Sequence, residues 1–245
     1  LKGVALFWPN IYNKITAKFK EVEMKKIFFS MLVVLFTACG GAKDITVDKL
    51  SFEKKSDTFS YNITVPQIKG SGNKNIEELN KELATGAESF ATSIEKGEND
   101  TPEFYEEGFE TFDNSFGITS ILMSSYGISK GDANGYGTSQ SINIRNKDGK
   151  LITFDDVFTK DGEAYLNEQV NAAVQGNSDR IVLNSNGDKV TIFFDEPEVN
   201  IRNASMYFEL DDICFLFETY ELTPHSEGKP VFRFPKTEIQ KFLLK

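Results

Sequence analysis

Hydrophobic and polar positions alternate with a period of two over several segments of the chain, which is the pattern of half-buried β-strands. In one segment Phe59, Tyr61 and Ile63 alternate with polar residues. Other segments are rich in aromatic, β-branched and hydroxyl-bearing residues, which also favour strands. Together these patterns predict strands over 45–53, 58–65, 104–112, 118–126, 137–145, 151–154, 180–184, 189–195 and 207–222.

Three segments carry a helical period instead. Apolar residues recur at spacings of three and four between Ile76 and Ile94, which predicts a helix with one buried face. Asn75 stands before this stripe, where its side chain can cap the first turn. A second helix is expected over 162–174, and a short third helix over 236–244 follows a proline that suits the first helical position.

Runs of strands mixed with a few helices indicate an α+β fold, with mostly antiparallel sheet and a few packed helices, rather than a parallel βαβ array. The pattern changes near Arg180, where a helix gives way to a strand-rich stretch. We therefore expect two modules, an N-terminal α+β module over 46–177 and a C-terminal strand-rich module over 178–245.

The N-terminal stretch up to Cys39 is composed differently from the rest. Lysines follow Met24, a nearly unbroken apolar run comes next, and small residues precede Cys39. The apolar run is too short to span a bilayer but suits a secretory signal. Its ending, Leu-Phe-Thr-Ala-Cys, resembles the lipobox of bacterial lipoproteins, in which the cysteine after the cleavage site carries the lipid. We expect a signal peptide over 24–38, lipid attachment at Cys39 and a tether over 39–45; a short buried helix ending in cysteine is the alternative.

Residues 1–23 precede a complete signal peptide, whose charged end belongs at the start of a chain. We expect them to be a misassigned upstream extension; a real amphipathic extension is the alternative, because four of their apolar residues have roughly helical spacing. The whole chain carries 27 Lys and Arg against 37 Asp and Glu, a formal net charge of −10. Residues 1–38 contain six Lys and two Glu, so the remainder carries −14. This acidity argues against a nucleic-acid partner, which requires a basic surface.

Three stretches of the body together resemble a known pair of domains. The first, 61–68, reads Tyr-Asn-Ile-Thr-Val-Pro-Gln-Ile ahead of a helix, and the second joins a glycine-rich loop at 126–135 to a hairpin at 146–158. The third, 217–228, reads Phe-Glu-Thr-Tyr-Glu-Leu-Thr-Pro-His-Ser-Glu-Gly. These paired domains of unknown function occur in the extracellular region of RsiV-like anti-sigma factors, which bind lysozyme, ahead of some peptidoglycan deacetylases, and as small secreted lipoproteins. The resemblance covers residues 45–245 and implies a lysozyme-like ligand.

Two of these stretches depart from the family's pattern. The family's Gly-Gly-Ala-His-Gly loop is Gly-Asp-Ala-Asn-Gly over 131–135, without the histidine, and its Pro-Tyr-Ala-Glu-Gly is Pro-His-Ser-Glu-Gly over 224–228. Neither a sigma-binding segment nor a deacetylase domain is recognised in the sequence. We therefore expect neither anti-sigma nor deacetylase activity.

The sequence contains few residues suited to nucleophilic catalysis. His225, the only histidine, lies in a turn rich in Pro, Ser and Gly and is expected at the surface. With Cys39 as the lipid site, Cys214 has no disulfide partner and is expected to be a buried, inert thiol in an apolar strand. Neighbouring residues of a strand face opposite sides, so adjacent acids are not expected to converge as an acid/base pair. Such adjacent acids occur at 106–107, 155–156 and 211–212.

No metal or cofactor site is expected. Two loops rich in Asp and Asn, 132–135 and 184–188, faintly resemble calcium loops but lack the full ligand series and the closing glutamate, so we interpret them as turns. The glycine-rich loop is a candidate ligand-binding loop, because exposed aromatic residues among polar ones suit recognition of a protein or glycan. A loop tyrosine that covers its own core is the alternative. The candidate residues of this loop are Tyr126, Asp132, Asn134 and Tyr136.

We therefore expect a non-enzymatic binding or sensor protein, lipid-anchored and extracytoplasmic in a bacterial cell envelope, on the outer membrane or the outer face of the inner membrane. Its most concrete partner is a lysozyme-like cationic protein, followed by a peptidoglycan-related ligand. One alternative is an enzyme that acts on envelope glycans with two converging carboxylates alone. Another is a structural envelope lipoprotein with no soluble ligand.

Overall fold

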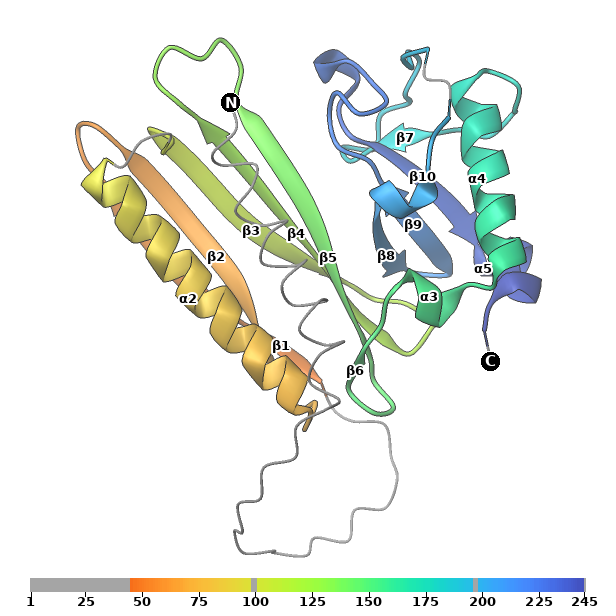
Figure 1. Cartoon of the computed structure of the whole chain (residues 1–245), viewed down its shortest axis with the longest axis horizontal. Coiled ribbons are helices and arrows are strands. Elements are labelled where there is room, and N and C mark those ends of the chain that lie inside the picture. Colours follow the sequence, from red (N-terminus) through yellow and green to blue (C-terminus); the bar gives the residue numbers. More distant parts are fainter. Residues whose placement is uncertain (1–44, 98–100, 196–197, 245) are drawn as a thin grey trace, which may run out of the picture.

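A computed structural model describes residues 45–97, 101–195 and 198–244. Its strands form two sheets with helices packed on them, so the predicted α+β class is confirmed (Figure 1). The larger sheet has the strand order β1-β2-β3-β4-β5-β6, and the smaller sheet has the order β7-β10-β9-β8. Neighbouring strands are antiparallel, except that β2 and β3 are parallel.

The elements have the following bounds. The large sheet contains β1 (Thr46–Lys55), β2 (Ser60–Lys69), β3 (Phe104–Phe112), β4 (Ile118–Ile128), β5 (Tyr136–Arg145) and β6 (Lys150–Leu151). The small sheet contains β7 (Leu183–Asn184), β8 (Ser205–Glu209), β9 (Asp212–Leu216) and β10 (Pro230–Pro235). The helices are α2 (Lys74–Lys96), α3 (Phe154–Val157), α4 (Lys160–Val174) and α5 (Lys236–Ile239), with short 3-10 helices η2 (Ile201–Asn203), η3 (His225–Glu227) and η4 (Gln240–Phe242).

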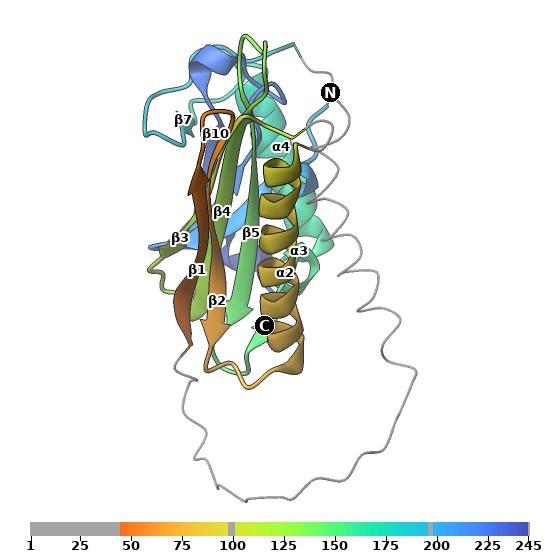
Figure 2. The ribbon, with the colours of Figure 1, turned by 90° about the vertical axis from the view of Figure 1, so that its left-hand side faces the viewer.

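The large sheet carries α2 on one face, where the helix packs mainly on β2 and also on β1 (Figure 2). The helix begins slightly earlier than expected, because Asn73 and not Asn75 is the N-cap. The Asn73 side chain accepts a hydrogen bond from the Asn75 N–H at 2.9 Å. The predicted apolar stripe is the buried face of this helix. Its buried residues include Ile76, Leu79, Leu83, Ala87, Ala91 and Ile94.

The parallel pairing of β2 with β3 covers only Ser60 to Ile63, so the second half of β2 has no strand on that side. The helix supplies the missing partner. Asn80 accepts a hydrogen bond from the Ile68 N–H at 2.9 Å and donates one to the Ile68 carbonyl at 2.7 Å. Pro66, which has no N–H, lies on this unpaired stretch, where no ladder hydrogen bond is lost.

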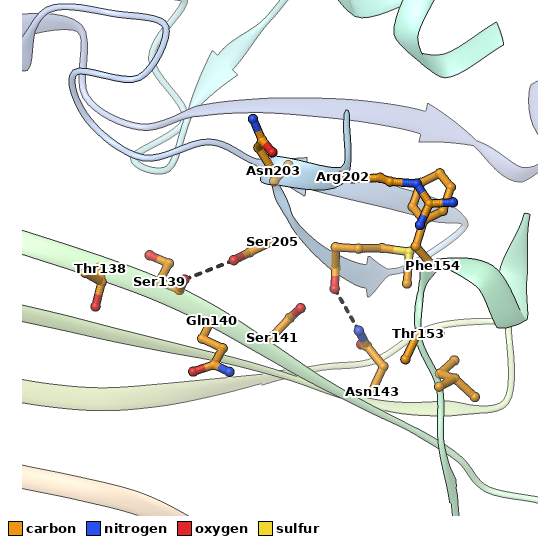
Figure 3. Close-up of a pocket in the computed structure, with 13 residues that line it drawn as sticks. Thr138, Ser139, Gln140, Ser141, Asn143, Thr153, Phe154, Arg202, Asn203 and Ser205 are labelled. Carbon is orange, nitrogen blue, oxygen red and sulfur yellow. Dashed lines mark hydrogen bonds between the residues drawn. The ribbon is translucent and has the colours of Figure 1, made fainter. Parts of the chain in front are cut away.

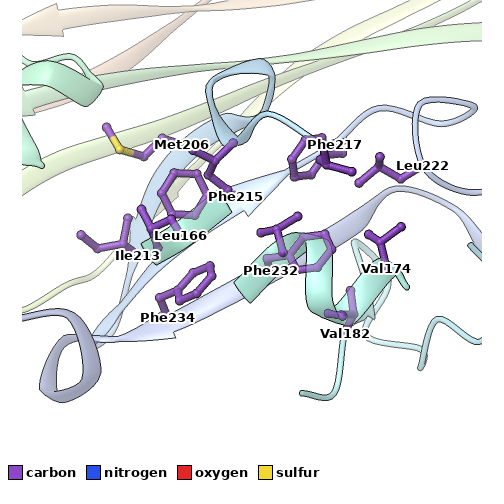
Figure 4. Packing of buried hydrophobic residues seen from close by; sticks show 14 of the residues in the cluster. Leu166, Val174, Val182, Met206, Ile213, Phe215, Phe217, Leu222, Phe232 and Phe234 are labelled. Atoms are coloured by element: carbon purple, nitrogen blue, oxygen red, sulfur yellow. The ribbon is translucent and has the colours of Figure 1, made fainter. Parts of the chain in front are cut away.

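The small sheet packs one face against α3, α4 and α5, and this core is rich in phenylalanine (Figure 4). Its phenylalanines Phe208, Phe215, Phe217, Phe232 and Phe234 are each at most 1% exposed. Alternate strand residues point to the other face and pack toward the large sheet. They are Tyr207, Cys214, Leu216 and Val231, which form a small cluster with Leu122 of β4.

The two sheets meet where the edge strand β8 lies against β4 and β5. Asn143 of β5 donates a hydrogen bond to the Met206 carbonyl at 2.7 Å, and the Phe208 N–H donates to the Ser120 hydroxyl at 2.9 Å. The Ser120 hydroxyl in turn donates to the Asn143 side-chain oxygen at 2.8 Å. Buried side chains of the large sheet therefore satisfy backbone groups on the outer edge of the small one.

The single strand expected over 207–222 is wrong. The segment contains the end of β8, a turn, the whole of β9 and the start of the next loop, because the chain turns at Leu210 with a φ of +52°. Backbone hydrogen bonds to the segment that follows β3 stabilise this turn. The Leu210 N–H donates to the Asp113 carbonyl at 2.7 Å, and the Ser115 N–H donates to the Leu210 carbonyl at 2.8 Å.

Other expected elements of the C-terminal module are shorter than predicted. Of the expected strand 180–184, only β7 lies in the sheet. The segment 189–195 contributes a single bridge, at Lys189, because backbone N–H groups farther along it bond to loop residues instead of a strand. The helix expected over 236–244 is the short α5 followed by η4.

The predicted N-terminal features lie outside the described residues. These are the extension 1–23, the signal peptide 24–38 and the lipid attachment site Cys39. In the part of the chain that the structure describes, no helix is both long and apolar enough to cross a membrane.

Candidate binding surface

Three loop segments gather at one end of the molecule, which we call the loop end. They are the β4–β5 loop (129–135), the extended segment 191–195 and the β9–β10 loop (217–229). Figures 1 and 2 both show this end at the top, whereas β1 begins at the bottom. The loop end is therefore far from the point where the chain enters the fold.

Tyr220 is an exposed residue of the β9–β10 loop with a strained backbone. Its φ is +69°, a left-handed conformation that bulky residues rarely adopt, and it is 56% exposed. Its ring centroid lies 5.9 Å from that of His225. The Tyr220 N–H donates to the Thr223 carbonyl at 3.0 Å, and the Thr223 hydroxyl donates to the Gly228 carbonyl at 2.7 Å. Hydrogen bonds within the loop thus hold an exposed aromatic ring on an unfavourable backbone.

The extended segment is fastened to the same loop. Glu227 accepts hydrogen bonds from the backbone N–H of Thr191 at 2.6 Å and of Ile192 at 3.3 Å, and the Thr191 donor is the main reason that the pKa of Glu227 is lowered. The Phe194 N–H donates to the Leu222 carbonyl at 2.8 Å. These bonds fix Ile192 and Phe194 while leaving them 53% and 36% exposed. We call Ile192, Phe194, Tyr220 and His225 the aromatic patch.

Carboxylates flank the aromatic patch. Burial raises the pKa of Glu221, the residue next to Tyr220. Glu218 forms an ion pair with Lys229 at 2.8 Å and accepts a hydrogen bond from a backbone N–H of β5, which ties the loop to the large sheet. Asp195 is exposed beside the extended segment. The aromatic patch thus has carboxylates next to it in the chain, at Asp195 and Glu221.

The tyrosines of the predicted ligand loop both pack on glycines across the β4–β5 hairpin. The Tyr126 ring covers Gly135, where an added Cβ would lie 2.2 Å from a ring atom, and Tyr126 is 42% exposed. Tyr136 covers Gly127 in the same way; its hydroxyl is buried, and burial raises the pKa of Tyr136 to about 12. Both rings therefore support the hairpin, and Tyr126 also presents a surface to solvent.

The polar residues of that loop lie beyond the tyrosines. Asp132 and Asn134 are both exposed, and Asp132 accepts a hydrogen bond from the Ser129 N–H at 3.3 Å. The structure thus brings the four predicted residues together on one hairpin. It leaves three of them, Tyr126, Asp132 and Asn134, accessible to a ligand.

Sequence reasoning missed the aromatic patch. Ile192 and Phe194 lie in a stretch predicted as a strand, and nothing local shows that they stay at the surface. The left-handed backbone of Tyr220 is likewise invisible in the sequence. The available signal was the turn composition that follows Tyr220, rich in Pro, Ser and Gly.

Other residues with chemical potential lie apart from one another. His225 is exposed in a surface turn and Cys214 is fully buried, so both expectations are confirmed. Glu106 is exposed, whereas Glu107 is 6% exposed. Adjacent acids of this strand therefore lie on opposite faces, as expected.

The adjacent acids Asp155 and Asp156 form ion pairs with different basic side chains. Asp155 pairs with Arg202 and Asp156 with Lys150, each at 2.5 Å. Among the described residues, no group of three or more His, Cys, Asp and Glu side chains could hold a metal ion.

The loop 184–188 is a turn closed by its own first residue. The Asn184 side chain accepts hydrogen bonds from the backbone N–H of Asn186 and of Asp188, each at 2.9 Å. It also donates to the Glu227 carbonyl at 3.0 Å, which attaches the turn to the loop end. The oxygen that a cation would need is thus engaged with the backbone.

Two hollows flank the junction of the sheets. The first, the polar groove, has a volume of about 370 Å³ and is lined mostly by neutral hydroxyl, amide and apolar side chains (Figure 3). Arg202, its charged lining residue, lies 4.7 Å from the Phe154 ring centroid and binds Asp155 and Glu163, each at 2.5 Å. The groove is lined by Thr138, Ser139, Gln140, Ser141, Asn143, Ile152, Thr153, Phe154, Arg202, Asn203, Ala204, Ser205 and Met206.

The second hollow, the cleft, has a volume of about 480 Å³ and lies between the facing surfaces of the two sheets. Its carboxylates are Glu110 and Glu209. Arg233 binds Glu209 at 2.5 Å and lies 3.5 Å from the sulfur of Cys214.

Comparison with known families identifies the part of the chain that carries the aromatic patch. Residues 155–237 match DUF3298, a protein family of unknown function. The DUF3298 match runs from α3 into α5 and so includes the small sheet, its phenylalanine core and the aromatic patch. The β4–β5 loop lies outside it. No curated protein matches the chain significantly.

Solved structures of two DUF3298 proteins resemble this chain. The protein from Pseudomonas aeruginosa PAO1 is 14% identical and aligns over 84% of this chain and 96% of its own, with a TM-score of 0.51. A member from Bacteroides fragilis NCTC 9343 is also 14% identical and aligns over 83% of this chain and 95% of its own, with a TM-score of 0.47. The first alignment is longer than either module, so the shared fold includes both sheets.

Proposed function

We propose that this chain is a lipid-anchored, extracytoplasmic binding protein whose loop end takes a cationic protein of the lysozyme type. The observation that carries the proposal is Tyr220, an exposed ring on a left-handed backbone beside His225. Backbone strain clusters at functional sites, and tyrosine is a frequent anchor of protein interfaces. The resemblance to the paired domains of RsiV-like proteins supports the same ligand class.

The place where the chain enters the fold supports this arrangement. β1 begins at Thr46, at the opposite end of the molecule from the loop end, to which the segments of the aromatic patch belong (Figures 1 and 2). A lipid on Cys39 would attach a few residues before this strand, so the patch would lie far from the anchor. Each buried CH₂ of an acyl chain contributes about 0.8 kcal/mol, and the two or three chains of a lipoprotein cysteine would hold stably.

The acidity of the chain supports a cationic ligand. Beyond residue 38 the formal net charge is −14. Opposite charge speeds the encounter of two proteins, and salt screens that attraction. We expect binding to weaken as salt rises, with the contacts of the aromatic patch setting the affinity that remains.

We propose binding rather than catalysis. A glycosidase of the carboxylate type needs two acids that converge on one substrate. In the cleft Glu209 is bound by Arg233, and beside the polar groove Asp155 and Glu163 hold Arg202. These acids are engaged in ion pairs, which supports a structural use of them.

Calorimetry with lysozyme tests the proposed ligand. The full chain in detergent micelles is titrated with lysozyme at low and at moderate salt, beside the variants Tyr220→Gly and Leu210→Gly. Both substitutions relieve a left-handed backbone, but Leu210 lies in the β8–β9 turn, away from the loop end. We expect Tyr220→Gly to weaken binding by about tenfold or more, which is about 1.4 kcal/mol, and Leu210→Gly to leave it unchanged.

Two results would rule out lysozyme as the ligand. One is the absence of binding at low salt by the wild-type chain. The other is an equal loss in both variants, since a specific contact of Tyr220 cannot explain it. Circular dichroism confirms that each variant is folded before it is titrated.

The anchor is tested separately. Cells that express the full chain are labelled with radioactive palmitate, and we expect the label on the wild-type chain and not on Cys39→Ala. An unlabelled wild-type chain would refute the proposed lipid anchor, but it would not affect the conclusion of the lysozyme experiment.

A further inference from the structure

The strand β1 forms a long open edge of the large sheet, on the near side in Figure 2. In β2 the Ser60 N–H donates to the Glu103 carbonyl and the Ile68 N–H donates to Asn80, so even-numbered residues of β2 point away from β1. The antiparallel register of β1 with β2 then directs the N–H and C=O groups of alternate β1 residues outward. These outward residues are Val47, Lys49, Ser51, Glu53 and Lys55.

The edge strands β5 and β8 are engaged with side chains across the junction of the two sheets. On β5 the Ser139 N–H donates to Glu218, and the Ser139 carbonyl accepts from the Ser205 hydroxyl. On β8 the backbone bonds to the side chains of Asn143 and Ser120. No hydrogen bond from the described residues reaches the outer edge of β1. An uncovered edge of this length is a template for another strand.

The residues of β1 complement a second copy of β1. If two copies pair antiparallel about Ser51, Lys49 stands opposite Glu53 of the second copy, and Leu50 stands opposite its Phe52. Twofold symmetry repeats each pair. Ser51 is an outward residue, so the hydrogen-bonded pair falls on the symmetry axis, as an antiparallel register requires.

The exposure of these side chains suits the pairing. Lys49 and Glu53 are exposed, and neither forms an ion pair with another described residue. Leu50 and Phe52 are only half-buried, so contact with a second copy would cover apolar surface. They would fall in a non-hydrogen-bonded pair, where facing side chains are closest.

We propose that a second copy of this chain docks on the β1 edge and joins the two large sheets into one continuous sheet. Asp48 would also meet Lys54 of the second copy, beside the ion pairs that these side chains make with Lys69 and Glu95. The contact is symmetric and closes as a dimer. Its twofold axis runs perpendicular to the joined sheet.

Cysteine cross-linking in the full chain tests the register. Ser51→Cys places two thiols on the symmetry axis, where paired Cα atoms lie about 5.5 Å apart, within reach of a disulfide. Lys55→Cys is the matched control, on the same edge but about 27 Å from its copy at roughly 3.4 Å per residue. After oxidation of expressing cells with copper phenanthroline, we expect about tenfold more linked dimer from Ser51→Cys than from Lys55→Cys or the wild type. The wild type, with Cys39 and Cys214, sets the background.

Charge exchange tests the chemistry of the contact. In the Ser51→Cys background, Lys49→Glu sets acids opposite each other and Glu53→Lys sets bases opposite each other, so each should abolish the cross-link. Co-expression of these two variants with different tags restores opposite charges in both pairs, and only the mixed dimer should form. Equal cross-linking of Ser51→Cys and Lys55→Cys, an undiminished cross-link in either single charge variant, or no cross-link at all would overturn the proposal.

Discussion

The two sheets bury their apolar side chains in different ways. The large sheet packs mainly aliphatic residues beneath one long helix, among them Ile63, Val65 and Ile121, and leaves β1 open along one edge. The small sheet packs phenylalanines against several short helices, and side chains of the large sheet cover its outer strand. The closed, aromatic module carries the aromatic patch, whereas the open module carries the edge proposed for assembly. The binding surface and the dimer contact that we propose thus belong to different cores, and changes in each core should separate them.

The largest expected effect lies in the phenylalanine core. Phe232 is fully buried, and its ring meets that of Phe217 edge-on at 5.6 Å. Phe232→Ala should lower the free energy of unfolding by about 3–5 kcal/mol, because it removes buried apolar surface and leaves a cavity. Denaturant titration followed by circular dichroism measures the loss. The control Phe194→Ala, at a residue that is 36% exposed, should cost less than about 1 kcal/mol. Similar losses in both variants would show that the closed core does not dominate the module.

In the large sheet, a buried acid should make stability depend on pH. Glu107 lies on the same face of β3 as Tyr105, whose hydroxyl donates to it at 3.1 Å. Burial raises the pKa of Glu107 from 4.5 to about 7 despite that hydrogen bond. The protonated form therefore stabilises the folded state. This contribution is complete below about pH 4.5 and is lost as the pH rises to about 7, amounting to about 3 kcal/mol at most.

The variant Glu107→Gln isolates the contribution of Glu107 ionisation to the free energy of unfolding. Unfolding free energies of the wild type and the variant should agree most closely near pH 4.5 and diverge up to about pH 7, where the variant is the more stable. The exposed neighbour provides the control, Glu106→Gln, which should follow the wild type. A Glu107→Gln curve parallel to that of the wild type would contradict the effect.

Local patterns predicted the large sheet better than the small one. The stripe from Ile76 to Ile94 is the buried face of α2, because an amphipathic period depends only on near neighbours. The turn at Leu210 went unrecognised, since its residues carry no Gly or Asn signal. It is stabilised by Asp113 and Ser115, almost 100 positions earlier in the chain.

The residues of the candidate site likewise differ in how far local sequence predicts them. The glycines and tyrosines of the β4–β5 loop marked Tyr126 as a surface residue, and the structure leaves it 42% exposed. Tyr220 was missed because its exposure and left-handed backbone depend on hydrogen bonds made after the loop has folded. Cys214 was predicted as buried because an apolar strand surrounds it in the sequence.

The smallest effect is expected at the junction, and it tests whether the two sheets behave as separate units. Asn143→Ala removes the donor to the Met206 carbonyl and the acceptor of the Ser120 hydroxyl, leaving buried polar groups without these partners. The free energy of unfolding should fall by about 1–3 kcal/mol. Ser124→Ala, at an exposed hydroxyl of β4, is the control and should change it by less than about 0.5 kcal/mol.

Hydrogen exchange locates the consequence of Asn143→Ala. The Phe208 amide, which donates to Ser120 across the junction, should exchange faster in the variant. The amide of Ile63, buried in β2 far from the junction, should keep its wild-type rate. Acceleration confined to β8 and its contacts would mean that the small sheet can loosen while the large one stays folded. If both amides accelerate equally, the sheets open as one cooperative unit, and neither recognition nor assembly can be assigned to one core alone.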